Sequence, residues 1–353
     1  MDLLNPYYLQ IVMFFIINAI MGISIYFTLA SGQLSLGAAG FMSVGAYVGA
    51  MLSLKAELPI VVGILVGGLV ASLVAVIIGL PTTRLKAALV AVVIGLPTTR
   101  LKGLYLAIAT LGFGEVVRVI FLNLDVTNGA LGLSGIPSIP QELTNYAYEF
   151  DMDGLMGLDA VTWGNLIAII ILLAILVLII TFCVRINNSR VGRAFAAIKA
   201  DDHAAELMGI NVVYYKMMAF IIGAFIAGIG GGLYAHITNF INPTDFSYHK
   251  VVQILLFPVF GGSNVVWGSV LGSFILTLLP EVLRFLSDYR DIIYGALLVI
   301  LMAVRPDGIL TESMVDKISR KLGFKKAPYI PESQVLTERF EAYKRKQQEE
   351  KQG

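Results

Sequence analysis

The sequence has little charge: Asp, Glu, Lys and Arg make up 14% of its 353 residues, against about 25% in soluble domains. Hydrophobic residues make up 57%, and several apolar runs approach the roughly 20 residues that a membrane-spanning helix needs. This composition excludes a soluble globular domain and predicts an all-α, polytopic integral membrane protein. The net charge of +1 argues against nucleic-acid binding.

Chemical motifs are equally scarce. Cys183 is the single cysteine, which excludes an intramolecular disulfide and a cysteine-based metal site. The three histidines form no i,i+4 pair, so we expect no metal site. No G-x-x-x-x-G-K-[ST], H-E-x-x-H or G-x-S-x-G sequence occurs. We therefore expect no enzymatic chemistry and no nucleotide or other cofactor bound by this chain.

Apolar runs predict about nine transmembrane or re-entrant segments, at 8–30, 33–54, 58–80, 104–123, 162–184, 214–236, 248–262, 265–279 and 291–304. The segments at 248–262 and 265–279 are short and interrupted by glycine. Irregular backbone at membrane depth is tolerated only inside protein or beside a cavity, so these two segments predict a re-entrant pair or recessed helices. The membrane domain then covers 1–310, and a polar tail follows at 311–353.

Lys and Arg are missing between Arg118 and Arg185, where the connecting loop carries only acidic charges. Basic residues mark cytoplasmic loops, so we expect this loop to face outside. The basic "TTRLK" pieces, the charged loop at 187–213 and the tail then face the cytoplasm. An N-terminus outside and nine crossings satisfy all these assignments.

The charged loop at 187–213 has the pattern of two short helices. Its first part places four apolar residues on one helical face, namely Val191, Ala194, Phe195 and Ile198. Asp201 or Asp202 is suited to cap the second helix, and Gly209 stands where a glycine ends it. The spacing alone favours a solvated loop and a docking element equally.

Small residues recur every four positions in two predicted membrane helices. They are Gly45 and Gly49 in one helix, and Gly223, Ala227, Gly231 and Ala235 in the other. Such stripes let helix backbones approach closely in lipid, so they predict helix packing. Glu115 and Arg118 are i,i+3 neighbours and predict either a structural ion pair or a place on a translocation path. The glycine-rich stretch at 127–137 is either a floppy loop or an ordered surface loop.

The stretch "AAELMG" at 204–209 resembles the cytoplasmic motif of ABC-importer permeases, although His203 replaces the usual preceding glutamate. The longer stretch at 192–220 is similar to branched-chain amino acid permeases of the LivM type. So are "SGQLSLGAAGFMSVGAY" (31–47), "RLKGLYLAIATLGFGEVVR" (100–118), "GLSGIP" (132–137), "FGGSNVVWGSVLGS" (260–273) and "RDIIYGALLVILMAVRPDGIL" (290–310). The resemblance covers roughly 8–310. Relatives often carry histidine at the position of Ala38, which leaves the role of that position open.

This resemblance implies an importer of leucine, isoleucine and valine in the plasma membrane. It further implies a second, homologous permease, two ATPase subunits that use ATP, and an external solute-binding protein. Small residues should let the second short helix enter a groove on the ATPase. The implied coupling residues are Arg193, Phe195, Ile198, Asp201, Asp202, Ala204, Ala205, Glu206 and Gly209, and the candidate path residues are Gln33, Ser35 and Glu115. Alternatives are a permease for urea, short amides or sugars, and an ion-driven carrier.

A tandem repeat interrupts the chain. The stretch "LVAVIIGLPTTRLKA" (73–87) recurs as "LVAVVIGLPTTRLKG" (89–103), and the resemblance continues from the second copy, so one copy is surplus. Its apolar part at 87–96 is about 15 Å long as a helix, too short to span the hydrocarbon core. We expect a short helix or hairpin at the inner face, or competition with 73–80 for the end of the third membrane helix.

Overall fold

The computed structural model describes residues 5–84, 104–150 and 158–282, with a few further positions between 295 and 314. Over these residues, six helices are long and apolar enough to cross a membrane. They are α1 (Pro6–Ala30), α2 (Ala38–Lys55), α3 (Ile60–Arg84), α5 (Leu104–Asn123), α7 (Ala160–Asn187) and α10 (Val212–Thr238). The predicted all-α, polytopic architecture is confirmed.

Two shorter helices form a bent pair. The pair consists of α11 (Tyr248–Gly261) and α12 (Val266–Val282), which are bent by 119° at the break between them. The glycine-interrupted segments predicted at 248–262 and 265–279 correspond to these helices. The ninth predicted segment, at 291–304, and the surplus repeat segment at 87–96 lie outside the described residues, apart from isolated positions of the former.

Short elements connect the long helices. The helices are α6 (Ile139–Glu149), α8 (Arg190–Ala200) and α9 (Asp202–Leu207), with 3₁₀ turns η3 (Asp125–Thr127), η4 (Gly129–Leu131) and η6 (Pro243–Phe246). Strands β1 (Leu133–Ser134) and β2 (Phe240–Ile241) pair antiparallel, with Leu133 opposite Ile241. The glycine-rich stretch at 127–137 is therefore an ordered loop, because this pairing ties it to the chain after α10.

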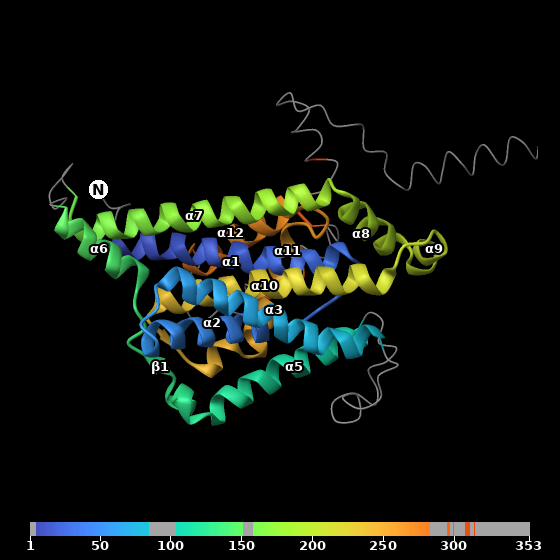
Figure 1. The fold of residues 1–353 in the computed structure, drawn as a ribbon. Coiled ribbons are helices and arrows are strands. Elements are labelled where there is room, and N and C mark those ends of the chain that lie inside the picture. The colour runs from blue at the N-terminus through green and yellow to red at the C-terminus, as the bar shows by residue number, and fades with distance from the viewer. Residues whose placement is uncertain are drawn as a thin grey trace, which may run out of the picture. The chain divides into compact units, whose positions relative to one another are not determined.

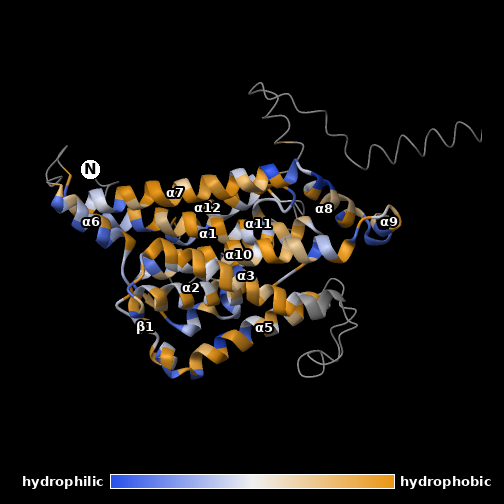
Figure 2. Cartoon of the chain, viewed as in Figure 1, coloured by the Kyte–Doolittle hydropathy of each residue, from blue (hydrophilic) through white to orange (hydrophobic). Residues whose placement is uncertain are grey.

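Helix α10 lies at the centre of the bundle and packs against α1, α2 and α3 (Figure 1). Helices α3 and α7 expose large aliphatic side chains along their length, as expected for a surface that meets lipid. Their most exposed members are Val61, Leu65, Leu69, Leu73, Ile77, Ile170, Leu173, Val177 and Leu178. Hydrophobic colouring runs along these helices in Figure 2.

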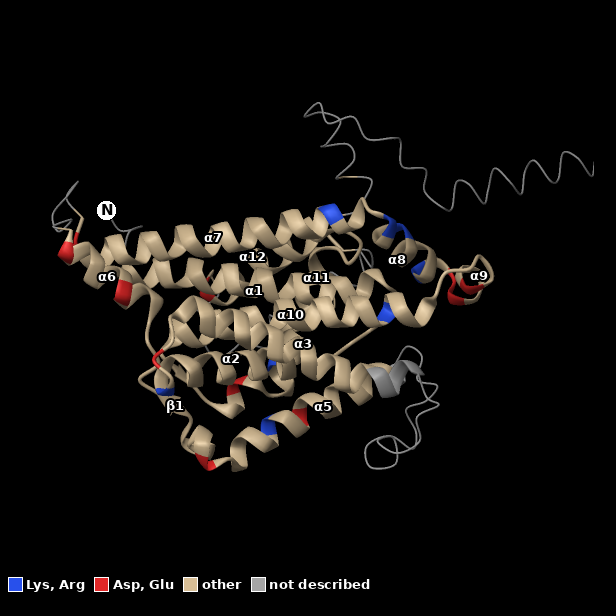
Figure 3. Ribbon diagram, viewed as in Figure 1, with Lys and Arg blue, Asp and Glu red and all other residues tan. Residues whose placement is uncertain are grey.

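The bundle of long helices has two opposite ends (Figure 1). We name them the α6 end and the α8 end, after the short helices found there. At the α6 end, the Tyr7 hydroxyl donates to Glu281 Oε2 at 2.7 Å. This hydrogen bond joins the start of α1 to the end of α12. At the α8 end, Lys199 Nζ donates to Asn264 Oδ1 in the α11–α12 break. The break between α11 and α12 therefore lies at the α8 end, and α12 ends at the α6 end. Figure 3 shows basic residues on α8 and acidic residues on α6 and α9.

The chain divides into two compact units, Met1–Ile309 and Leu310–Gly353. The predicted boundary between a membrane domain at 1–310 and a cytoplasmic tail at 311–353 stays a prediction. Nearly all of the second unit lies outside the described residues, and every element named above belongs to the first unit.

Candidate functional site

Helices α8 and α9 are a sharply punctuated pair. The Ser189 side chain caps α8 by accepting the Val191 N–H at 3.1 Å. Asp201 caps α9 by accepting the N–H groups of His203 at 2.8 Å and Ala204 at 3.1 Å. At the other end Gly209 has φ +81°, and the N–H groups of Gly209 and Ile210 bond back to Glu206 and Ala205. This is the Schellman pattern of helix termination, and it fixes α9 as a rigid element.

Helix α8 is anchored in the bundle by its apolar face. Ala194, Phe195 and Ile198 are buried, and the Phe195 ring meets Tyr215 of α10 edge-on, with the ring centroids 6.3 Å apart. Arg193 is exposed. A Cβ atom on Gly32 would lie 3.2 Å from the Lys199 Cα, so α8 also touches the α1–α2 connection. Helix α8 therefore contacts both α10 and this connection.

The side chains of α9 differ sharply in exposure. Ala205 is 3% exposed and packs inside this chain, whereas Leu207 is 88% and Met208 82% exposed. Burial of Ala205 leaves Leu207 and Met208 as the apolar surface of α9, and entry of this helix into a groove on the ATPase stays a prediction. Adjacent helical residues point about 100° apart, so Ala204, which is exposed, and Ala205 cannot share the outer face. The apolar pair just before the C-terminal glycine was the signal that the sequence reasoning missed.

Asp202 and Glu206, the other two acidic residues of the α8–α9 segment, have different surroundings. Asp202 forms an ion pair with Lys216 at the start of α10, which ties α9 to that helix. Glu206 is exposed. The predicted coupling residues therefore divide into two groups: some hold α8 and α9 to the bundle, and others lie at the surface.

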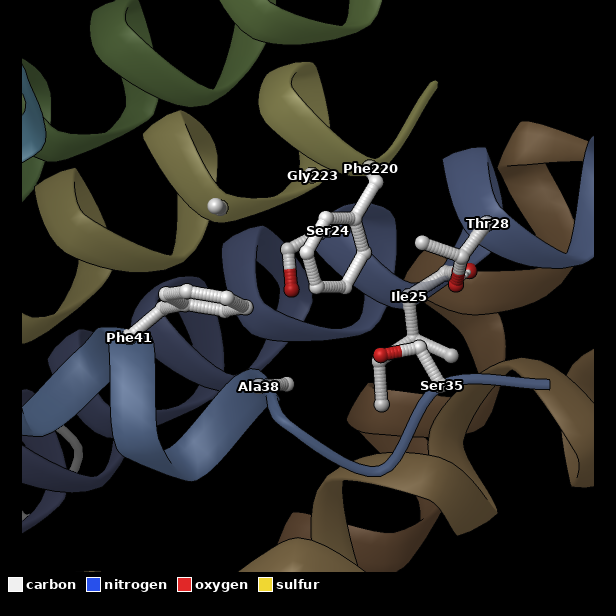
Figure 4. Close-up of a pocket in the computed structure, with 9 residues that line it drawn as sticks. Ser24, Ile25, Thr28, Ser35, Ala38, Phe41, Phe220 and Gly223 are labelled. Atoms are coloured by element: carbon white, nitrogen blue, oxygen red, sulfur yellow. Dashed lines mark hydrogen bonds between the residues drawn. The ribbon is translucent and has the colours of Figure 1, made fainter. Parts of the chain in front are cut away.

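Of the candidate path residues, Ser35 lines a small pocket between α1, α2 and α10 (Figure 4). Its lining comprises Ser24, Ile25, Thr28, Ser35, Ala38, Phe41, Phe220, Gly223 and Ala224. Ser24 and Thr28 donate their hydroxyl protons to carbonyls of their own helix, at 2.7 and 2.8 Å, so their lone pairs remain as acceptors. Gln33 is buried but, like Glu115, is not part of this lining.

Glu115 is engaged on both of its carboxylate oxygens. Oε2 accepts from Arg118 Nε at 2.6 Å, and Oε1 accepts the Tyr248 N–H, the first of α11, at 3.1 Å. This is the predicted i,i+3 pair with an additional bond to α11. The carboxylate thus holds the start of α11 against α5.

The small-residue stripes lie where helices approach most closely. A Cβ atom on Gly45 would stand 2.1 Å from the Gly228 carbonyl oxygen, and one on Gly231 would stand 1.9 Å from that of Met42. On Gly223 it would meet the Ser24 oxygen at 2.7 Å, and on Gly49 the Gly63 oxygen at 3.4 Å. Ala227 and Ala235 are buried. These positions bring α10 to backbone distance of its neighbours.

Comparison with known families finds a match to the family described as branched-chain amino acid transport system / permease component, over residues 7–88 and 85–302. The chain belongs to this family. The permease is a multi-pass membrane protein, and the family resemblance predicted from its motifs is confirmed. No solved structure matches it significantly.

Individual relatives agree with this assignment. The permease is 30% identical over 288 residues to the high-affinity branched-chain amino acid transport system permease protein LivM of Escherichia coli, which covers 79% of this chain and 64% of that relative. It is 32% identical over 163 residues to LivH of the same organism, covering 46% and 50%. The ribose import permease protein RbsC of Haemophilus influenzae is 29% identical over 132 residues, covering 35% and 41%. The chain thus spans less than two thirds of the length of these relatives.

The family match falls into two pieces that overlap at 85–88. The first piece contains the whole first copy of the tandem repeat, and the second contains the whole second copy. The break between the two pieces thus falls within the repeat.

Proposed function

We propose that this permease is a transmembrane subunit of an ABC importer that moves leucine, isoleucine and valine across the plasma membrane. The observation that carries the proposal is the 30% identity to LivM over 79% of the chain. A second, homologous permease completes the pathway, and the shorter similarity to LivH supports such a pairing. Two ATPase subunits supply the free energy from ATP, and an external binding protein delivers the substrate.

We place the ATPase at the α8 end and the binding protein at the α6 end. The N-terminus and the acidic loop then lie outside, and the tail lies in the cytoplasm. Exposed apolar side chains on a charged surface favour a protein contact, and Leu207 and Met208 supply such a surface on α9. Phe195 and Ile198, which are buried in the bundle, carry the motion inward from that contact.

The inward route has two branches in the proposed mechanism. Lys199 bonds to Asn264 in the α11–α12 break, and its backbone lies against Gly32, three residues before Ser35 of the pocket. Closure of the ATPase dimer therefore moves α8 against both the bent pair and the α1–α2 connection. Rigid-body shifts of packed helices of this kind are a common means of switching between two states.

The test is reconstitution in liposomes, with the permease pair alone and together with its ATPase and binding subunits. Uptake of labelled leucine that requires ATP and the ATPase supports the proposal. Uptake by the permease alone, driven by an ion gradient, would establish a secondary carrier instead. Because RbsC is also similar, labelled ribose is tested beside leucine, urea and short amides, and ribose uptake in place of leucine would reassign the substrate.

A further inference from the structure

Lys250 is a cation in the first turn of α11 that has no ion-pair partner within the part of the chain that the structure describes. Its ammonium lies 5.6 Å from the centroid of the Tyr234 ring on α10. Its hydrogen bond to Gln253 Oε1 is long, at 3.5 Å. Both contacts are weak for a charged group, so most of its hydrogen-bonding capacity is unused.

This ammonium lies at membrane depth. Helix α11 begins beside Glu115, which is eight residues before the end of α5 at Asn123. At 1.5 Å per residue, the start of α11 lies about 12 Å from the end of α5, measured along the axis of α5. A charged group inside the membrane is costly unless it meets protein or water, and it marks a functional site by default.

The face that carries Lys250 is unlike the surface that meets lipid. Large aliphatic side chains dominate the exposed faces of α3 and α7, whereas Tyr234, Lys250 and Gln253 are half-buried and polar. Lipid cannot satisfy these groups. The face formed here by α10 and α11 is therefore suited to meet water, ligand or protein rather than lipid.

A charge of opposite sign lies close by. Asp245 of η6 directly precedes Phe246, whose ring lies 6.1 Å from the Tyr234 ring that the Lys250 ammonium faces, yet the two charges do not form an ion pair among the described contacts. Its Oδ2 atom accepts the Asn242 N–H at 3.0 Å, and no hydrogen bond to its Oδ1 atom is seen in the described part of the structure. Each charged group thus keeps unused hydrogen-bonding capacity, and the two groups do not pair directly.

The Tyr234 ring that Lys250 faces belongs to a cluster of aromatic rings. The Tyr234 ring lies 6.3 Å from Phe14 of α1 and 6.1 Å from Phe246 of η6, centroid to centroid. A zwitterionic amino acid with an apolar side chain requires a cation, an anion and an apolar wall. Residues from α1, α10, η6 and α11 supply these three elements together.

We infer that Lys250 binds the carboxylate of the transported amino acid, and Asp245 its ammonium, at a site between α10 and α11 near the α6 end. The inference rests on the proposed function, because it takes the cargo to be an amino acid. The site would recognise the charges common to all amino acids, while selection of the side chain takes place largely elsewhere.

The test compares Lys250→Gln, Lys250→Arg and Asp245→Asn in the complete transporter, with Lys55→Gln as the control. Lys55 is exposed at the end of α2, and its ammonium donates to the Val126 carbonyl. It is far from the proposed site in the sequence. We expect Lys250→Gln to lower ATP-dependent leucine uptake at least about tenfold, as loss of a charge-assisted bond implies. Lys250→Arg should retain most uptake, and Lys55→Gln should retain all of it.

A binding measurement separates recognition from folding. Saturation-transfer NMR on the nanodisc complex without binding protein uses 4-methylpentanoate, which has only the carboxylate, and isopentylamine, which has only the ammonium. Lys250→Gln should abolish the signal of the acid alone, and Asp245→Asn that of the amine alone. Equal uptake and equal signals in Lys250→Gln and wild type would overturn the inference while leaving the proposed function intact. A wild-type complex that moves no amino acid would overturn both.

Discussion

Replacing Gly45 by alanine puts a methyl carbon 2.1 Å from the Gly228 carbonyl oxygen. Ordinary carbon–oxygen contacts begin at 3.4 Å, so α2 and α10 must separate by roughly 1 Å to admit the methyl group. Overpacking of this kind costs about 1–3 kcal/mol. The oxygen belongs to helix backbone and cannot rotate away, which makes the upper part of this range the expected cost.

Two further glycines provide graded controls in the same protein. A Cβ atom on Gly49 meets its nearest atom at 3.4 Å, and one on Gly112 meets nothing within 4 Å. We expect Gly49→Ala to be tolerated and Gly112→Ala to be neutral or slightly stabilising, since alanine favours helix by up to about 1 kcal/mol.

The assay is thermal unfolding of the purified variants in detergent, monitored by the loss of monodisperse protein. A cost of 1 kcal/mol lowers Tm by about 2–4 °C in domains of 150–250 residues, so Gly45→Ala should unfold several degrees below wild type. If Gly45→Ala and Gly112→Ala unfold at the same temperature, α2 and α10 do not pack at backbone distance and the reasoning fails.

Three further predictions use matched positions. Leu207→Glu should abolish co-purification of the ATPase, while Leu131→Glu, at a residue 80% exposed against 88% for Leu207, should not; equal yields in both would refute docking through α9. Cysteines at these two positions, in a Cys183→Ala background, should differ in intact cells: an impermeant thiol reagent should label position 131 and not 207, and the reverse pattern would invert the topology. Deleting residues 81–96 should leave a transport-competent permease, and normal synthesis without uptake would mean that the repeat is structural.

Local signals in the sequence predicted the helices and their ends well. An apolar run fixes a spanning helix because its length must match the bilayer, and the six long helices follow such runs. Capping is equally local: Asp201 accepts the first N–H groups of α9, and Gly209 ends it with a positive φ. Residue type and spacing predicted Gly209 at the end and either Asp201 or Asp202 at the cap, and the structure selects Asp201.

The features that the sequence could not predict depend on contacts between segments that are far apart in the chain. Ala204 and Ala205 are identical in chemistry, and only the docking of α9 on the bundle decides that Ala205 is buried. The same holds for Glu115, whose second oxygen accepts from Tyr248 more than a hundred residues away. Gly261 is a stronger case: a Cβ atom there would lie 1.7 Å from the Gly268 oxygen, a contact created by the turn between α11 and α12.

The tandem repeat shows how sequence and family comparison constrain each other. A membrane helix cannot gain 16 residues without moving charge or apolar surface to the wrong depth, because its length is matched to the bilayer. Both copies carry the same Arg and Lys, which favour the cytoplasmic side. The family match resolves this conflict by assigning one copy to each of two pieces that overlap at 85–88. Helix α3 contains most of the first copy, since it extends to Arg84. Deletion of 81–96 joins Leu80 to the second "PTTRLK" and leaves a single copy of the repeat, which is why we expect it to preserve transport.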